Sequence, residues 1–409
     1  MNILIRQIKM IDPFAGTEKR VDILILKDKL AEIGDKIQPV SNVRVLDGEK
    51  LAADPGLVDM HCHLREPGFT YKEDITSGMQ SAAAGGFTTV AAMPNTRPTA
   101  DSREVIELVK SKADLINVLP IGAITYGLAG VRMTNFEELI RAGAVAFSDD
   151  GVGLVDDYVM EQAIAKAHTL GVPVISHCED VTCLEPSQTD PEIIYKNNCA
   201  AEQNMVEREV MLAGKTGGRV HIAHVSTLGS VEIIRRAKKE GVKVTAETCP
   251  HYFSLTNQAL KTFGANARMN PPLGRQQDVD AVIAGLQDAT IDAIATDHAP
   301  HSPEEKQGKN PPNGIIGFET ALPVSITYLY KTGKLSLMEI IKKLTVLPAG
   351  ILGLDIKSRT RDLVIFAPDQ SFEYRDIESK SRNTPYFRQR LFGKVYCTIS
   401  RGNTVYNRL

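Results

Sequence analysis

Residues 57–64 read LVDMHCHL, a short apolar run that ends in two histidines separated by one residue. Seven further runs follow at intervals of roughly 20–50 residues, with amphipathic segments such as SREVIELVKSKAD (102–114) between them. These runs are FTTVAAMPN (87–95), INVLPIGAIT (116–125), AVAFSDD (144–150), PVISHCED (173–180), RVHIAHVST (219–227), KVTAETCPHY (243–252) and AIATDHAP (293–300). Continuous apolar runs are typical of parallel strands that are buried on both faces.

Eight strand–helix units are the number that a closed (β/α)8 barrel requires. We therefore predict an α/β fold with a TIM-type barrel, whose active site lies at the carboxyl ends of the strands. A doubly wound open sheet is the alternative, but no G-x-G-x-x-G motif follows the first run.

The two ends of the chain differ from the middle in their pattern of apolar and turn residues. Short, partly alternating runs broken by turn residues occur near both ends, as in ILIRQIKMID (3–12), VDILILKD (21–28) and GKVYCTISRGNTVYN (393–407). Such runs indicate antiparallel strands. We predict that residues 1–53 and 346–409 form one small β-sandwich-like domain, and that residues 54–345 form the barrel.

The overall composition is that of an ordinary globular protein. The 409 residues are 43% hydrophobic and 24% charged, with a formal net charge of −3. This balance creates no field that would attract nucleic acid or an anionic membrane surface. No apolar run reaches the roughly 18 residues that span a bilayer, and the first residues lack the apolar core of a secretion signal. We therefore expect a cytoplasmic protein whose six scattered cysteines are reduced.

Several of the runs end in side chains that bind metals. The polar ends are His61-Cys62-His63, Ser148-Asp149-Asp150, His177, His224 and Asp297. Residues i and i+2 of a strand share a face, so His61 and His63 can bind the same ion. If all these strands belong to one barrel, the five ends converge on one mouth.

Four imidazoles and two carboxylates exceed the roughly three or four protein ligands of a single catalytic zinc ion. They suit two metal ions joined by a bridging carboxylate, a site that polarises a carbonyl group and makes hydroxide from water near neutral pH. A buried carboxylate such as Asp297 is costly without a metal or a cation beside it. The remaining histidines are interpreted as structural: His168, His221, His251 and His298.

The motifs around these residues resemble those of the dihydroorotase family. DMHCHLREPG (59–68) is similar to its first signature, and ATDHAPH (295–301), with Lys306 five positions on, is similar to the second. Other blocks resemble the family in the same order, namely MPNT (93–96), FSDDG (147–151), HCED (177–180) and MNPP (269–272). The resemblance covers essentially the whole chain. It implies a bacterial-type member of the amidohydrolase superfamily that interconverts N-carbamoyl-L-aspartate and L-dihydroorotate in pyrimidine biosynthesis.

The same resemblance implies two zinc ions per chain. The histidine ligands would be His61 and His63 for the first ion, and His177 and His224 for the second. Many relatives bridge the metals with a carboxylated lysine. Here the fourth run ends in Ser-Asp-Asp, which resembles the branch in which an aspartate and a hydroxide form the bridge. Asp150 is the expected bridge from its place in the block and its spacing to His177, and Asp149 is the alternative.

Asp297 would bind the first zinc and act as the catalytic base and acid. It would take a proton from the bridging hydroxide during attack and give it to the leaving ring nitrogen. A substrate carboxylate needs a cationic partner, and Arg65 lies two residues beyond His63, on the same face of the predicted strand. The resemblance implies that the substrate contacts are His63, Arg65, Asn95, Asn270, His301, Asn313 and Gly314.

Two segments depart from the usual family pattern. The chain reads Pro-Pro-Leu-Gly-Arg where relatives usually read Pro-Pro-Leu-Arg, which moves the basic residue to Arg275. It also reads Pro312-Asn313-Gly314 where many relatives read Pro-Phe-Gly. We expect both segments to border the ligand.

Two other hypotheses compete with this interpretation. A hydantoinase, dihydropyrimidinase or allantoinase would share the barrel, but these enzymes usually have the bridging lysine and lack the HLREPG run (63–68). An inactive chain that scaffolds aspartate transcarbamoylase would have lost metal ligands, whereas all six candidates are present here. The expected partner is a small-molecule substrate, with no nucleic acid and no membrane. A homodimer and an active complex with aspartate transcarbamoylase are both left open.

Overall fold

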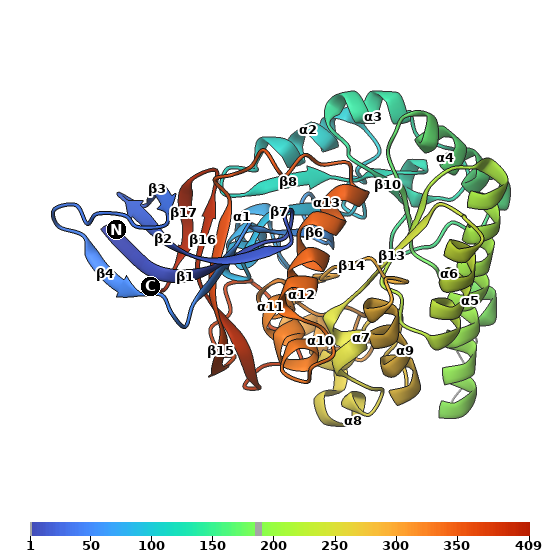
Figure 1. Ribbon diagram of the computed structural model, residues 1–409. Coiled ribbons are helices and arrows are strands. Elements are labelled where there is room, and N and C mark those ends of the chain that lie inside the picture. The colour runs from blue at the N-terminus through green and yellow to red at the C-terminus, as the bar shows by residue number, and fades with distance from the viewer. Residues whose placement is uncertain (1, 185–189) are drawn as a thin grey trace.

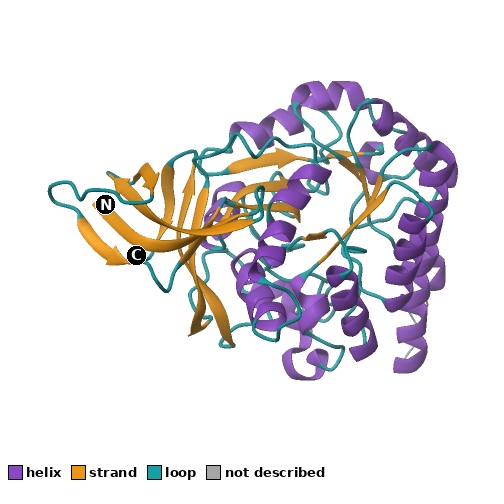
Figure 2. Cartoon of the chain, in the orientation of Figure 1, coloured by secondary structure: helices purple, strands orange, loops and turns teal. Residues whose placement is uncertain are grey.

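The computed structural model describes residues 2–184 and 190–409. Helices surround a ring of strands in one part of the molecule, and a second part consists of strands from both ends of the chain (Figures 1 and 2). The functional residues predicted from the sequence all belong to the first part, which we call the barrel.

The eight apolar runs form the strands of the barrel and follow one another in chain order. These strands are β6 (Leu57–Cys62), β7 (Phe87–Ala92), β8 (Asn117–Pro120), β9 (Gly122–Ala123), β10 (Phe147–Ser148), β11 (Val174–Ser176), β12 (Val220–Ile222), β13 (Val244–Thr248) and β14 (Ala293–Ile294). They pair in two arcs, β6-β7-β8 and β9 to β14. Only Ile121 separates β8 from β9, and the Pro120 carbonyl accepts a 3.1 Å hydrogen bond from Val145 N, so the arcs are continuous.

The last strand meets the first and closes the ring. Cys62 at the end of β6 forms a parallel bridge with His298, which follows β14. His63 N donates a hydrogen bond of 2.8 Å to His298 O at the same joint. The α/β class is therefore confirmed, and the open-sheet alternative is wrong.

Helices connect and cover the strands. They are α1 (Ile75–Ala84), α2 (Arg103–Ser111), α3 (Phe136–Ala142), α4 (Asp157–Thr169), α5 (Pro191–Thr216), α6 (Leu228–Lys239), α7 (Pro250–Ser254), α8 (Ala259–Phe263), α9 (Gln276–Gln287), α10 (Pro303–Gln307), α11 (Phe318–Ser325), α12 (Leu337–Leu344) and α13 (Val346–Ile351). Short 3-10 or π turns are η1 (Tyr126–Leu128), η2 (Val181–Cys183), η3 (Gly264–Ala267) and η4 (Ile326–Tyr330). The amphipathic pattern of α2 places Val105, Ile106 and Val109 in the core, as expected for a helix packed on strands.

One end of the barrel is plugged by apolar side chains. Leu352 packs with Met60, Ala91 and other interior residues of the strands, and Ala349 of α13 packs against Val58. The plug leaves the carboxyl ends of the strands as the open end, which is where the polar residues of the runs lie.

The strands from the two ends of the chain form one sheet. They are β1 (Asn2–Asp12), β2 (Thr17–Leu26), β3 (Lys29–Gly34), β4 (Arg44–Asp47), β5 (Ala52–Asp54), β15 (Leu363–Glu373), β16 (Arg390–Ser400) and β17 (Asn403–Asn407). Their order is β2-β3-β17-β16-β15-β5-β1-β4, and β1 also pairs with β2, so the sheet returns on itself. The β-sandwich-like domain predicted from the sequence is corrected to this single closed sheet, because the β1–β2 hairpin joins what would be two layers. The predicted boundary at residues 345 and 346 stays a prediction.

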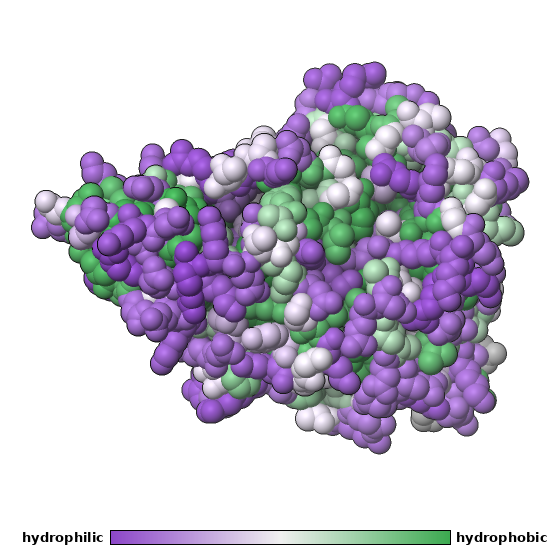
Figure 3. Space-filling model, in the orientation of Figure 1, coloured by the Kyte–Doolittle hydropathy of each residue, from purple (hydrophilic) through white to green (hydrophobic). Residues whose placement is uncertain are grey.

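The hydrophilic surface and the free cysteines agree with what the composition predicts. Hydrophilic residues cover much of the outer helices, including α5 and α6 (Figure 3). Within residues 2–184 and 190–409, no helix is both long and apolar enough to cross a bilayer. All six cysteines are free, as expected.

A close contact between the covering helices α1 and α11 tests the packing of the closed barrel. A Cβ on Gly85, at the end of α1, would lie 2.2 Å from the backbone oxygen of Phe318 in α11. We predict that Gly85→Ala lowers the free energy of unfolding by about 1–3 kcal/mol, because backbone must move to admit the methyl group. The matched control is Gly350→Ala in α13, where a Cβ meets nothing within 4 Å. Thermal and urea unfolding midpoints measure both variants, and equal stability would contradict the packing.

Candidate metal centre and substrate pocket

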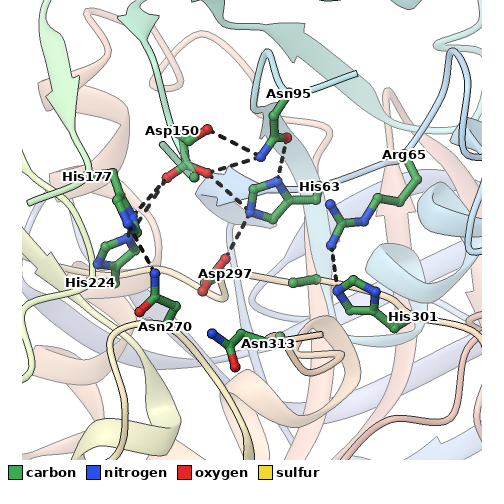
Figure 4. A pocket seen from close by; sticks show the side chains of 13 residues that line it. His63, Arg65, Asn95, Asp150, His177, His224, Asn270, Asp297, His301 and Asn313 are labelled. Atoms are coloured by element: carbon green, nitrogen blue, oxygen red, sulfur yellow. Dashed lines mark hydrogen bonds and ion pairs between the residues drawn. The ribbon is translucent and has the colours of Figure 1, made fainter. Parts of the chain in front are cut away.

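The six predicted metal ligands lie together at the open end of the barrel, and Figure 4 shows five of them, all except His61. They come from the ends of β6, β10, β11, β12 and β14, and all are buried. Two groups of three have ligand atoms within 4.8 Å of one another: His61, His63 and Asp150, and Asp150, His177 and His224. Asp150 belongs to both groups.

Asp150 lies between the two pairs of histidines. Its Oδ1 is 3.4 Å from His61 Nε2, 3.7 Å from His177 Nδ1 and 3.9 Å from His224 Nε2. Its Oδ2 is 3.5 Å from His63 Nε2. One carboxylate thus presents an oxygen to each histidine pair, as a bridging ligand must.

Asp149, the alternative bridge, faces away from the histidines. Its Oδ1 accepts hydrogen bonds from the backbone nitrogens of Ile124 (2.8 Å) and Thr125 (3.0 Å), and its Oδ2 accepts one from the Thr125 hydroxyl. Asp149 therefore anchors the loop after β9, and the geometry favours Asp150 as the bridge.

Asp297 contacts the first histidine pair only. Its Oδ1 lies 3.0 Å from His63 Nε2 and 3.6 Å from His61 Nε2. Its backbone is in the left-handed region, with φ of 45°, which is uncommon for a residue other than glycine. The preceding residue is fixed, because Asp59 accepts hydrogen bonds from Thr296 N (2.9 Å) and Thr296 Oγ1 (2.6 Å).

The charges of this cluster support one another. Burial alone would raise the pKa of Asp150, but the neighbouring His61 charge and hydrogen bonds from His224 and His61 hold that pKa well below its usual range. Burial would likewise raise the pKa of Asp297, and hydrogen bonding to His63 and the His61 charge lower it instead. Both carboxylates are therefore ionised and available to a cation.

The donor set fits a metal ion. His61 Nε2 is buried, has no hydrogen-bond partner among the described residues, and faces the Asp150 and Asp297 oxygens. Buried polar atoms without a partner are rare in native proteins. A mixture of imidazole and carboxylate ligands is typical of zinc and related divalent metals.

Glu247 on β13 belongs to the site but was missed by the sequence analysis. Its Oε1 lies 2.7 Å from His61 Nδ1, and its Oε2 lies 3.3 Å from His221 Nε2. Burial raises the pKa of Glu247, but the hydrogen bonds with His221 and His61 outweigh it and lower that pKa to about 2. This contact turns His61 Nε2 towards the metal centre. The signal in the sequence was a single acid inside the apolar run KVTAETCPHY (243–252).

The predicted substrate residues line one cavity of about 260 Å³ beside the metal cluster. Its walls include every predicted substrate contact, namely His63, Arg65, Asn95, Asn270, His301, Asn313 and Gly314. Asn95 Oδ1 lies 2.9 Å from His63 Nδ1, and Asn270 Nδ2 donates to His177 Nε2 over 3.3 Å. The amides therefore orient metal-site histidines as well as facing the cavity.

Arg65 reaches the cavity by a different route from the one predicted. We expected it on the same strand face as His63, but β6 ends at Cys62 and Arg65 lies in the following loop with φ of 60°. Its Nε donates to Pro300 O (3.1 Å), and its Nη2 lies 3.3 Å from His301 Nε2. Lys72 Nζ lies 3.3 Å from the other ring nitrogen of His301. Glu305 pairs with Lys72 over 3.0 Å, so Arg65 supplies the net positive charge on this side of the cavity, which suits a carboxylate.

Only one of the two departing segments borders the cavity. Asn313 and Gly314 line it, as expected. Arg275 does not: it forms an ion pair with Glu192 and stacks 3.9 Å from the ring centre of Tyr195. The expectation that the Gly274-Arg275 segment contacts the ligand is corrected, because α5 engages the arginine outside the cavity.

Comparison with known proteins gives a consistent result. A family model described as "Dihydro-orotase-like" matches residues 51–230. The chain is 44% identical to a dihydroorotase of Ruminiclostridium cellulolyticum, covering 99% of this chain and 98% of the relative. It is 42% identical to a dihydroorotase of Clostridioides difficile, covering 99% and 100%.

Solved structures of similar shape share the fold. An L-hydantoinase (dihydropyrimidinase) from Arthrobacter aurescens superposes with a TM-score of 0.86 and 23% identity, covering 99% of this chain and 96% of that one. A dihydropyrimidinase from Brevibacillus agri gives 0.84 and 22%, covering 100% and 95%.

The two adjacent aspartates allow a matched test of the bridge. We predict that Asp150→Asn loses bound metal, because an amide cannot supply two anionic oxygens to two ions. Asp149→Asn keeps its metal and loses about 1 kcal/mol of stability, because one hydrogen bond of the loop anchor is weakened. Metal analysis after dialysis and thermal unfolding measure both variants. Full metal in Asp150→Asn would assign the bridge to another residue.

Glu247 provides a second test, at a residue that does not contact the cavity. We predict that Glu247→Gln weakens metal binding about 10–100-fold, because an uncharged partner makes His61 a poorer ligand. Competition with a chelator of known affinity measures the change. An unaltered affinity would mean that His61 needs no support from β13.

Proposed function

This chain belongs to the dihydroorotase family of cyclic amidohydrolases, and on that premise we propose that it interconverts N-carbamoyl-L-aspartate and L-dihydroorotate in pyrimidine biosynthesis. The observation that carries the proposal is a single cavity with a metal-binding cluster on one wall and Arg65 with His301 on another. Dihydroorotate carries both groups that such a cavity recognises, a cyclic amide and a carboxylate.

We propose that the cluster holds two zinc ions per chain. His61, His63 and Asp297 would bind the first, His177 and His224 would bind the second, and Asp150 would bridge them. The two groups of ligand atoms that share Asp150 support this assignment. When bound, the zinc ions would polarise the amide carbonyl and lower the pKa of water towards neutrality.

Asp297 is proposed to move the proton. Its carboxylate lines the cavity, is ionised and is 3.0 Å from His63 Nε2. In the hydrolytic direction, Asp297 accepts a proton from the attacking water as the new C–O bond forms. It then donates that proton to the ring nitrogen as the C–N bond breaks. Ring closure follows the same steps in reverse, with the side-chain carboxylate of carbamoyl aspartate as the electrophile.

The remaining wall is proposed to hold the substrate. Arg65 provides the planar fork that pairs with the ring carboxylate, and Asn95 and His301 complete that clamp. Burial and the positive charges of Arg65 and Lys72 lower the pKa of His301 to about 3, so its ring is neutral. Binding of the ring amides of the substrate is assigned to three residues that line the same cavity, Asn270, Asn313 and Gly314.

Three proposals rest on the sequence pattern. We propose a cytoplasmic location, and a barrel of residues 54–345 with a small domain of residues 1–53 and 346–409. The chain is proposed to act on a small molecule and to bind neither nucleic acid nor membranes. A homodimer and a complex with aspartate transcarbamoylase are tested by light scattering of the pure chain, alone and with the transferase.

Turnover of matched substrates tests the assignment. We predict that the zinc-loaded chain hydrolyses L-dihydroorotate, and that Arg65→Met lowers kcat/KM about 10–100-fold through loss of a charge-assisted hydrogen bond. Hydrolysis of dihydrouracil, which lacks the carboxylate, is unaffected by Arg65→Met. Arg275→Met is the control, since Arg275 pairs with Glu192 outside the cavity.

Two results would redirect the proposal. Metal without turnover of dihydroorotate, together with turnover of hydantoin or allantoin, would assign the chain to other cyclic amides. Bound zinc without any hydrolysis, and a stable complex with the transferase, would favour the scaffold hypothesis.

A further inference from the structure

The long connection between β15 and β16 returns from the closed sheet to the mouth of the barrel. It comprises residues 374–389, and its buried residue Asn383 lies beside the wall that holds His301. Connections of this length within a compact structure usually have a function. We propose that Asn383 is a positioning residue that fixes the carboxylate-binding wall of the cavity, an inference that rests on the proposed function.

Asn383 joins two separate loops of that wall. Its Oδ1 accepts a hydrogen bond from His301 N (3.1 Å). Its Nδ2 donates to Ala299 O and to Gly314 O, each over 3.0 Å. Its own carbonyl accepts from Ile316 N (2.9 Å). Residues 299–301 and 314–316, which also bond directly through Ala299 N and Ile315 O (2.8 Å), are thus further tied through one residue that is 2% exposed.

The wall needs such a tie because it has open space on both sides. His301 lines the substrate cavity and also a second cavity of about 260 Å³. The second cavity is lined by Phe263, Ala265, Asn266, His301, Pro303, Lys306, Gln307, Arg382 and Asn383. The ring nitrogens of His301 contact Arg65, Lys72 and Glu305, each at 3.3 Å. The hydrogen bond to His301 N sets where the backbone that carries this ring lies.

The segment that carries Asn383 is itself held rigidly. Glu319 of α11 accepts hydrogen bonds from Glu378 N (3.0 Å) and Ser379 N (3.2 Å), and Glu73 accepts one from the Ser379 hydroxyl. Both acids are buried. These hydrogen bonds therefore hold the segment, and Asn383 with it, in a fixed position against the barrel, as accurate positioning of a binding group requires.

No other side chain of this size meets the three contacts. Aspartate can accept from His301 N, but it places a negative charge against the carbonyl oxygens of Ala299 and Gly314. Alanine removes all three side-chain hydrogen bonds. A loosened wall displaces His301, and with it the hydrogen-bonded Arg65 fork, while Asp150, His177 and His224 are held at the ends of other strands.

The experiment compares Asn383→Ala and Asn383→Asp with the wild type and with Asn117→Ala. Asn117 on β8 is the control, because its side chain also bonds backbone, at Thr88 O (3.0 Å), but at the start of a barrel strand. We expect both Asn383 variants to keep the wild-type metal content. Their KM for L-dihydroorotate rises about tenfold, with kcat changed less than about threefold, and Asn117→Ala leaves KM unchanged.

A second readout separates positioning from a general loss of structure. The ratio of kcat/KM for dihydroorotate to that for dihydrouracil falls about tenfold in the Asn383 variants, because only the first substrate has the carboxylate. Equal losses for both substrates, or a wild-type KM in a folded Asn383 variant, would overturn the inference. If the alanine variant does not fold, the isosteric aspartate variant decides the result. Absence of dihydroorotate turnover in the wild type would instead reject the proposed function.

Discussion

The hydrogen bond from His63 N to His298 O is the joint on which the rest of the structure depends. It closes the ring of strands by joining His63 to His298, the residue after Asp297, and the side chains of His63 and Asp297 lie 3.0 Å apart. Closing the barrel therefore also brings together His63 and Asp297, two of the candidate metal ligands. A chain that formed β6 to β14 without this joint would keep its histidines but would separate them from the carboxylate that is proposed to move the proton.

Burial of so much charge is tolerated because each charged group is paired. The histidine pairs face Asp150, and further acids and amides stand behind the histidines: Glu247 behind His61, Asn95 beside His63, and Glu179 3.5 Å from His177 Nε2. An isolated ion in this environment would cost several kcal/mol. The arrangement leaves the ligand atoms aimed at a common centre, with Glu247 fixed on β13 and with Asn95 and Glu179 close to the ends of β7 and β11.

The sequence predicted those features that depend on local pattern. Apolar runs and the residue types at their ends were enough to anticipate the strands and the clustering of six candidate metal ligands, since the ends of parallel strands share one edge. Hydrogen-bond partners that are distant in the chain could not be predicted from local pattern: Glu247 is 186 residues from His61, and Asn383 is 82 residues from His301. The closed small sheet and the loop position of Arg65 were misjudged for a related reason. Both depend on how strands end and fold back, which periodicity does not encode.

The pairing of β5 with both β1 and β15 has a consequence for the synthesis of the protein. Asp54 pairs with Val364, 310 positions later in the chain. At ~5–20 residues per second, the free edge of β5 waits roughly 15–60 s on the ribosome before its partner exists. Unpaired strand edges are sites of association between chains. The nascent chain thus carries an exposed edge throughout synthesis of its barrel, until β15 covers that edge and the connection after β15 delivers Asn383 to the pocket.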